Sequence, residues 1–350
     1  MPAPFHQGGF KLKLLKELSE APGVPGREEA IRAIVRRELK GKVDKIEEDA
    51  MGNIIAFKKG SAKNAKKIMF AAHMDEIGFY VRFIDDDGFL RVQNAGGFDT
   101  RNLFARRVHV HTAKGVLDGI MNPAGKPIHM ATPEDLKKYL EIGEFCVDVG
   151  LTGDEAKRKV RVGDPITLNA PFVEFGKYAS GKCFDDRAQV WVGIKALQKM
   201  KAPKNDVYGV FTVQEEVGLR GAFTSAYGVN PDVGIALDTT LACDTPGITA
   251  DQHITKLGKG VGIKIMDGAS ISDRGLVDEF IAVAEKNKIA YQLEILPRGG
   301  TDAGAIQRAR SGVKAITLSI PTRYIHTVTE TVHKDDLNGT LELLVKYLEK

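Results

Sequence analysis

The hydrophobic pattern of the first 76 residues predicts the start of an α/β protein. Two amphipathic patterns with helical spacing lie between Leu12 and Leu39 and flank the breaker at residues 22–26, which indicates a helix, a loop and a helix. Residues 53–57 and 67–73 read as strands. The second strand is nearly all apolar, as expected in a sheet that is covered on both faces.

The pattern then changes to short alternating strands between about residues 77 and 170. Residues 85–88, Asp-Asp-Asp-Gly, predict a hairpin turn between the first two strands. A single helix-like piece, residues 133–140, interrupts the series. The predicted strands are 79–84, 89–92, 108–112, 115–121, 146–151 and 165–168. Many short strands separated by Gly and Pro indicate a small barrel or sandwich.

Alternating helices and strands return after residue 170. We therefore predict an open, mostly parallel α/β sheet with helices on both faces, formed by residues 1–76 and 171–350, and an inserted β-barrel domain at 77–170. The predicted helices are 185–199, 276–286 and 334–347. The predicted strands are one that ends at Gln214 and those at 232–237, 260–266, 291–296 and 313–320.

Composition excludes several classes of protein. The net charge of +4 and the pI near 8.7 are only mildly basic, and lysines alternate with acids, so we expect no nucleic-acid partner. Three cysteines without metal-type spacing predict reduced, buried thiols. Residues 1–10 lack a targeting pattern and no apolar run approaches the ~18 residues that span a bilayer, so we expect a cytoplasmic protein without a membrane partner.

Two adjacent carboxylates, Glu215 and Glu216, follow the predicted strand that ends at Gln214. On an extended backbone neighbouring side chains point to opposite sides, so the two glutamates can have different roles in one site. The ordinary alternative is a strand end that meets solvent, because acids are usually exposed.

Other polar side chains also lie at predicted strand ends, where open α/β sheets form ligand sites. Each has an ordinary alternative: His73 a core histidine, Asp185 a helix N-cap, Asp238 a turn acid, and His326 a loop residue. Together, two histidines and three carboxylates suit zinc, cobalt or manganese, and a shared carboxylate could bridge two ions. One glutamate would then remain as a general base, and Asp75 is close enough in sequence to orient His73.

Six motifs resemble the tetrahedral aminopeptidases, the group that contains bacterial glutamyl aminopeptidases and archaeal deblocking aminopeptidases. The match covers nearly the whole chain in the right order, and one departure is Thr327, where many relatives have serine. The motifs occupy residues 71–78, 184–187, 214–222, 236–238, 299–303 and 321–326.

The resemblance implies a di-metal aminopeptidase that acts on short peptides, with zinc or cobalt as the expected ions. It implies that Asp185 bridges the ions, that His73 and Asp238 complete one site and Glu216 and His326 the other. Glu215 would be the general base. It further implies a cis peptide bond between Asp185 and Asp186, a dimerisation role for the inserted domain, and assembly into a hollow dodecamer.

Two alternatives stay open at this point. A metal-independent glycoside hydrolase would use Glu215 and Glu216 as its carboxylate pair, but adjacent residues hardly reach the separation of about 5–9.5 Å that this chemistry needs. A non-catalytic shell protein is the other alternative, and it leaves the complete ligand set without a purpose.

Overall fold

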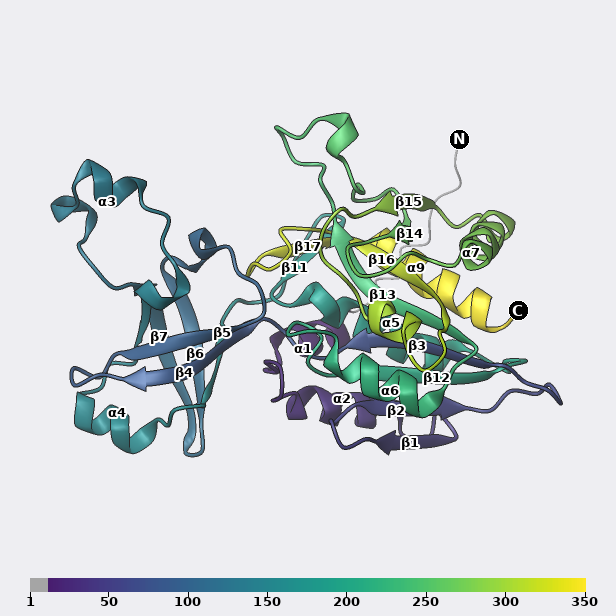
Figure 1. The fold of residues 1–350 in the computed structure, drawn as a ribbon, viewed down its shortest axis with the longest axis horizontal. Coiled ribbons are helices and arrows are strands. Elements are labelled where there is room, and N and C mark those ends of the chain that lie inside the picture. Colours follow the sequence, from purple (N-terminus) through teal and green to yellow (C-terminus); the bar gives the residue numbers. More distant parts are fainter. Residues whose placement is uncertain (1–11) are drawn as a thin grey trace.

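The chain forms an α/β body with a β-barrel beside it, as Figure 1 shows in this computed structural model. The structure describes residues 12–350, so the predicted absence of a targeting segment at 1–10 lies outside the described residues. Within that range no helix is both long and apolar enough to cross a bilayer.

The body is built on a mixed sheet in the order β1-β2-β12-β3-β13-β16-β17-β11-β10, with β14 beside β16 and β15 beside β14. Its centre, β12-β3-β13-β16, is parallel, and β2, β14 and β17 join this centre antiparallel, which confirms the predicted fold class. The strands are β1 Lys45–Glu48, β2 Ile54–Lys58, β3 Lys67–His73, β10 Val173–Phe175, β11 Tyr178–Gly181, β12 Asp206–Thr212, β13 Val233–Leu241, β14 Val261–Met266, β15 Tyr291–Ile295, β16 Lys314–Arg323 and β17 Glu330–His333.

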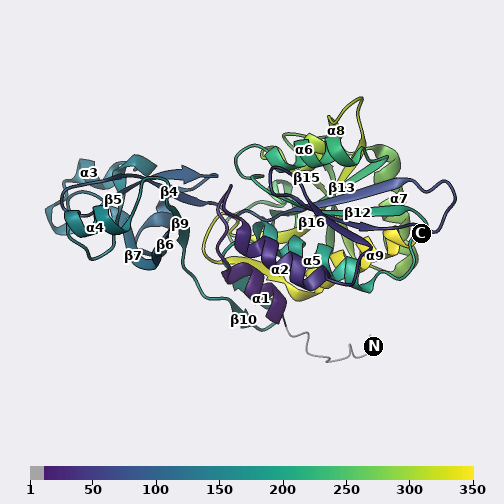
Figure 2. The same ribbon diagram turned by 90° about the horizontal axis from the view of Figure 1, so that it is seen from below.

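Helices cover both faces of the sheet (Figure 2). α1, α2, α5, α7 and α9 lie on one face, and α6 and α8 on the other. The helices are α1 Lys13–Glu20, α2 Glu29–Leu39, α5 Phe184–Lys199, α6 Arg220–Val229, α7 Arg274–Asn287, α8 Ala303–Gln307 and α9 Lys334–Leu348.

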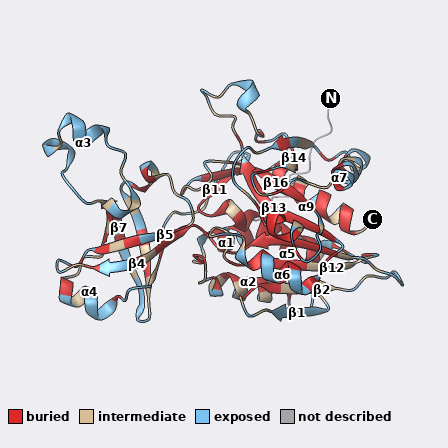
Figure 3. Cartoon of the chain, viewed as in Figure 1, coloured by how far each residue is buried: buried red, intermediate tan, exposed pale blue. Residues whose placement is uncertain are grey.

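The central strand β3 explains why the sheet is covered on both faces. Phe70 and Ala72 pack into the core on the side of α5, whereas Met69 and Ala71 pack into a second core beneath α6 and α8. Successive side chains of a strand point to opposite faces, so an apolar residue at every position requires two covering layers. Figure 3 shows the resulting buried centre.

The barrel closes in the order β4-β5-β8-β7-β6-β9, and it confirms the expected barrel and the hairpin at residues 85–88. The prediction of a single helix-like piece is wrong, because a second helix, α4, lies between β8 and β9. A capping box between Thr152 and Glu155 starts this helix. Its hydrophobic pattern is weak, because Ala156 is the one apolar side chain that it buries. The elements are β4 Gly78–Ile84, β5 Leu90–Ala95, β6 Arg106–Thr112, β7 Gly115–Pro123, α3 Pro133–Lys137, β8 Phe145–Asp148, α4 Gly153–Lys159 and β9 Pro165–Leu168.

Some predicted boundaries in the body are wrong. β12 ends at Thr212, before Gln214, and β13 continues through Asp238 to Leu241. α6 was not predicted, because it packs against the sheet through small side chains such as Ala222 and Ala226 and lacks an apolar stripe. Of the three cysteines, which are all free, only Cys183 is buried.

Candidate metal centre

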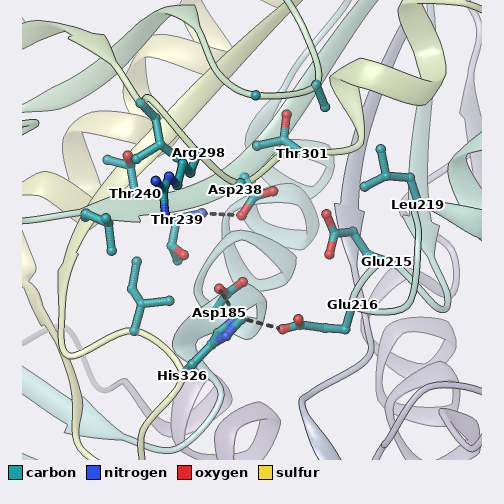
Figure 4. A pocket seen from close by; sticks show the side chains of 17 residues that line it. Asp185, Glu215, Glu216, Leu219, Asp238, Thr239, Thr240, Arg298, Thr301 and His326 are labelled. Carbon is teal, nitrogen blue, oxygen red and sulfur yellow. Dashed lines mark hydrogen bonds and ion pairs between the residues drawn. The ribbon is translucent and has the colours of Figure 1, made fainter. Parts of the chain in front are cut away.

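The carboxyl ends of the central parallel strands bring the predicted site residues to one edge of the sheet. His73, the last residue of β3, pairs with Thr212 at the end of β12, and Asp238 in β13 pairs with Ser319 in β16. A pocket of about 570 Å³ opens at this edge (Figure 4). Its lining includes five of the predicted residues: Asp185, Glu215, Glu216, Asp238 and His326.

Four side chains form the first ligand-type group, with one potential ligand atom from each within 4.8 Å of the others: His73, Asp185, Asp186 and Asp238. His73 Nε2 lies 3.1 Å from Asp185 Oδ1. Asp185 and Asp186 are brought here by the start of α5, where the backbone is non-helical and the peptide bond between them is cis, as predicted.

A second group contains Asp185, Glu216 and His326, again within 4.8 Å. His326 Nε2 lies 3.5 Å from Asp185 Oδ2 and 3.3 Å from Glu216 Oε1, and Figure 4 shows the three side chains pointing toward one another. Asp185 is therefore common to both groups.

Asp75 lies behind the pocket, fully buried. Its two carboxylate oxygens accept the backbone N–H groups of Glu215 and Glu216 at 2.9 and 3.0 Å. The ring Nδ1 of His73 lies 3.1 Å from the backbone oxygen of Asp75 and 3.6 Å from its carboxylate. Asp75 thus contacts three of the predicted site residues at once.

The two glutamates occupy a turn after β12, so the expectation of an extended backbone at this point is wrong. Gln214, directly before them, has a left-handed φ of 56°. The turn lets both side chains face the same centre, and Glu215 Oε2 approaches His73 Nε2 to 3.9 Å. Because β12 ends at Thr212, the alternation of a strand does not set the directions of the Glu215 and Glu216 side chains. The turn and the hydrogen bonds to Asp75 set them instead.

Charge is unbalanced in this cluster. Burial first, and then a neighbouring carboxylate, raise the pKa of Asp238 and of Glu215 well above the ordinary value. Burial disfavours the imidazolium of His73 and His326, but the carboxylates around them outweigh it, so the pKa of His73 lies well above its ordinary value and that of His326 rises to about 12. Such shifts mark an excess of buried negative charge.

Bound divalent cations would fit this centre. Buried carboxylate oxygens of Asp186 and Glu216 accept no hydrogen bond within residues 12–350, although buried polar atoms are normally satisfied. Imidazole and carboxylate ligands suit zinc and related ions. Cations would neutralise the excess charge and supply partners for these oxygens.

Two buried acids at the centre were not among the predicted site residues. Asp186 accepts the backbone N–H of His73 and is a member of the first group; its position next to Asp185 was the available signal. Asp302 accepts the hydroxyl of Thr212 at 2.6 Å, and burial raises its pKa to about 6. It lies in the motif at residues 299–303.

Beside the carboxylates and threonines, the pocket has apolar side chains and one cation, Arg298, in its lining. The apolar side chains include Leu219, Leu241, Leu296 and Ile325. The Arg298 side chain is exposed and makes no hydrogen bond or ion pair with any other residue that the structure describes. A side chain placed in this pocket could therefore pair with the Arg298 guanidinium, which no described side chain occupies.

Comparison with known proteins gives a family match over most of the chain. The model described as M42 glutamyl aminopeptidase matches residues 52–343. A protein named lysyl aminopeptidase from Pyrococcus furiosus is 35% identical over 344 residues, which cover 97% of this chain and 96% of that protein.

Solved structures agree with this match. An aminopeptidase from the archaeon Desulfurococcus kamchatkensis has a TM-score of 0.92 and 41% identity, and the alignment covers 97% of this chain and 94% of that one. The TET1 peptidase of Pyrococcus horikoshii, which is described as able to assemble into a tetrahedron or a large octahedral shell, has a TM-score of 0.87 and 35% identity. The alignment covers 97% of this chain and 99% of that one.

Proposed function

Because this chain belongs to the M42 glutamyl aminopeptidase family, we propose that it is a two-metal aminopeptidase that removes N-terminal residues from short peptides. Family membership supports the aminopeptidase activity. The observation that carries the two-metal mechanism is the pair of ligand-type groups that share Asp185.

The proposed ligands divide between two ions. His73 and Asp238 would complete one site and Glu216 and His326 the other, with Asp185 common to both. Zinc or cobalt is the expected metal, because the set combines imidazole and carboxylate. When bound, two such ions polarise a carbonyl oxygen and lower the pKa of water.

Glu215 is the proposed general base. Its carboxylate lines the pocket beside the ligand-type groups, with Oε2 3.9 Å from His73 Nε2, so it is placed to accept and return a proton there. It would take a proton from the attacking water and deliver it to the leaving amine. Asp75 would hold Glu215 in place through the backbone N–H that it accepts.

The carboxylates of the centre also suggest why cleavage would be limited to the N-terminal residue of a peptide. The free α-amine of a peptide would be held at this centre, by a bound ion and the carboxylates nearby, so that only the N-terminal residue could be removed. The first side chain would then enter the pocket lined by Leu241, Leu296 and Arg298.

A panel of aminoacyl chromogenic substrates tests this proposal. The full-length protein is stripped with a chelator and assayed before and after addition of zinc, cobalt or manganese. We expect hydrolysis only with metal, and none of N-acetylated substrates. Cellulase activity that survives chelation would overturn the proposal in favour of a glycoside hydrolase, and absence of hydrolysis with every metal would favour a non-catalytic shell.

Self-association is the second part of the proposal. We propose that residues 1–76 and 171–350 act as the catalytic domain and that the barrel at 77–170 mediates dimers, which build a dodecamer. The segment around α3 supports this, since its apolar side chains Ile128, Met130, Leu136 and Tyr139 are at least 60% exposed. Native mass spectrometry of wild type and of a chain with Ile128→Asp and Met130→Asp tests it. The cytoplasmic location stays a prediction.

A further inference from the structure

Glu330 is a buried acid that touches two separate parts of the metal centre. It is the first residue of β17 and is 1% exposed. One carboxylate oxygen accepts the backbone N–H of Asp185 at 2.9 Å, and the other accepts the backbone N–H of His326 at 2.7 Å. A single side chain thus joins the start of α5 to the loop after β16.

Both of these N–H groups belong to irregular backbone. Asp185 has a non-helical ψ of 101° at the start of α5. His326 has a left-handed φ of 62° and lies beyond the end of β16. Neither segment has a regular hydrogen-bond ladder to fix it here, and a buried N–H without a partner is costly. Glu330 supplies the partner for both.

The contact matters for the geometry of the site because Asp185 and His326 are two of the three members of the second ligand-type group. Their side chains approach to 3.5 Å, and the backbone N–H of each donates to the carboxylate of Glu330. If either hydrogen bond is lost, the distance between the two ligand atoms can change. The first group depends on Glu330 only through Asp185.

The alternative is that Glu330 only stabilises the fold. Asp336 makes the same type of contact elsewhere in the chain and serves as a control. Asp336 is also 1% exposed and also accepts two backbone N–H groups, those of Gly258 and Gly260 at 2.6 and 2.8 Å. It contacts none of the proposed ligands. Asp336→Asn therefore shows what the loss of one such hydrogen bond does to the stability of the fold, apart from any effect on the metal centre.

We propose that Glu330 is a positioning residue that sets the affinity of the site formed by Asp185, Glu216 and His326 by holding the backbone of Asp185 and His326 at a defined separation. This inference rests on the proposed two-metal function. Groups that orient metal ligands typically change metal affinity by about 10- to 100-fold when they are altered.

The test compares Glu330→Gln with Asp336→Asn in the full-length protein. Each substitution keeps the size of the side chain and replaces one acceptor oxygen by an amide donor, which cannot serve a backbone N–H. Metal-free proteins are titrated with cobalt(II), and binding is followed by calorimetry and by visible absorption. We expect wild type and Asp336→Asn to bind two ions alike. In Glu330→Gln we expect one ion to bind about 10- to 100-fold more weakly, and the other, whose site has only Asp185 in contact with Glu330, to be weakened less.

The outcomes separate the two levels of the proposal. If wild type binds no metal, the proposed function fails. If wild type binds two ions and Glu330→Gln binds both as wild type does, or weakens both to the same extent, the positioning role is overturned. Should Glu330→Gln fail to fold, Glu330→Asp is measured, because its shorter carboxylate keeps the charge but does not reach both N–H groups. Weakening of one ion in that variant supports the role, and unchanged binding of both overturns it.

Discussion

The carboxylate of Asp75 accepts the backbone N–H of Glu216 at 3.0 Å, and its second oxygen accepts that of Glu215 at 2.9 Å. One buried acid from the segment after β3 therefore sets the direction of both glutamates in the turn after β12. The proposed ligand and the proposed base are positioned together, because they share this support.

Replacement of Asp75 by Asn is expected to impair both metal binding by Glu216 and proton transfer by Glu215. The amide retains one acceptor, so one of the two backbone N–H groups loses its partner. We expect turnover and metal affinity each to fall by about 10- to 100-fold. The matched control is Asp336→Asn, since buried Asp336 also accepts two backbone N–H groups on separate oxygens, from Gly258 and Gly260. Equal losses in the control would contradict a role for Asp75 at the centre.

Glu215→Gln is expected to reduce kcat by about 10²–10⁴-fold, because the amide cannot accept a proton from water. Metal content, measured by mass spectrometry of the purified protein, should remain that of wild type. Glu216→Gln is the paired variant and should lose metal. If Glu215→Gln loses metal and Glu216→Gln retains it, the roles of the two glutamates are reversed.

Arg298→Glu is expected to change substrate preference. The exposed guanidinium lines the pocket without an ion-pair partner in the described chain, so reversal of its charge should disfavour an acidic first side chain. We expect the ratio of kcat/KM for glutamyl over lysyl substrates to fall by about tenfold or more, which corresponds to roughly 1.4 kcal/mol. Arg298→Met should give an intermediate ratio, and Arg274→Glu on α7 should leave it unchanged. An unchanged ratio in Arg298→Glu would show that this side chain does not face the substrate.

Asp336 predicts a pH dependence of stability away from the metal centre. Burial, and then repulsion from Asp335 and Asp244, raise its pKa from 3.8 to about 6. The folded state therefore holds this proton more tightly than the unfolded state, and its contribution to stability falls as pH rises from about 4 to about 6. That difference in pKa corresponds to roughly 3 kcal/mol.

Urea unfolding of metal-free protein between pH 4 and 7 measures this effect. Asp336→Asn removes the titrating group, so its free energy of unfolding should decline less over this range than that of wild type. The exposed Asp278 on α7 offers a control, and Asp278→Asn should keep the wild-type slope. An identical slope in Asp336→Asn and wild type would contradict the raised pKa.

The sequence by itself predicted the α/β body, the barrel and most of the side chains that the structure brings together at one edge of the sheet. Apolar spacing is a local property, so strands such as β3 and helices such as α9 could be recognised from their own residues. Several of the proposed ligands could be singled out because they lie at the ends of apolar strands, and parallel strands end at one edge of the sheet.

Only the tertiary structure decided which buried acids accept the backbone N–H groups of the proposed site residues. That Glu215 and Glu216 lie in a turn rather than on a strand depends on Asp75, which is 140 residues away. The support of Asp185 by Glu330 spans 145 residues. Backbone N–H groups outside helices and sheets take whatever acceptor folding brings to them, and such long-range partners leave no periodic signal in the sequence.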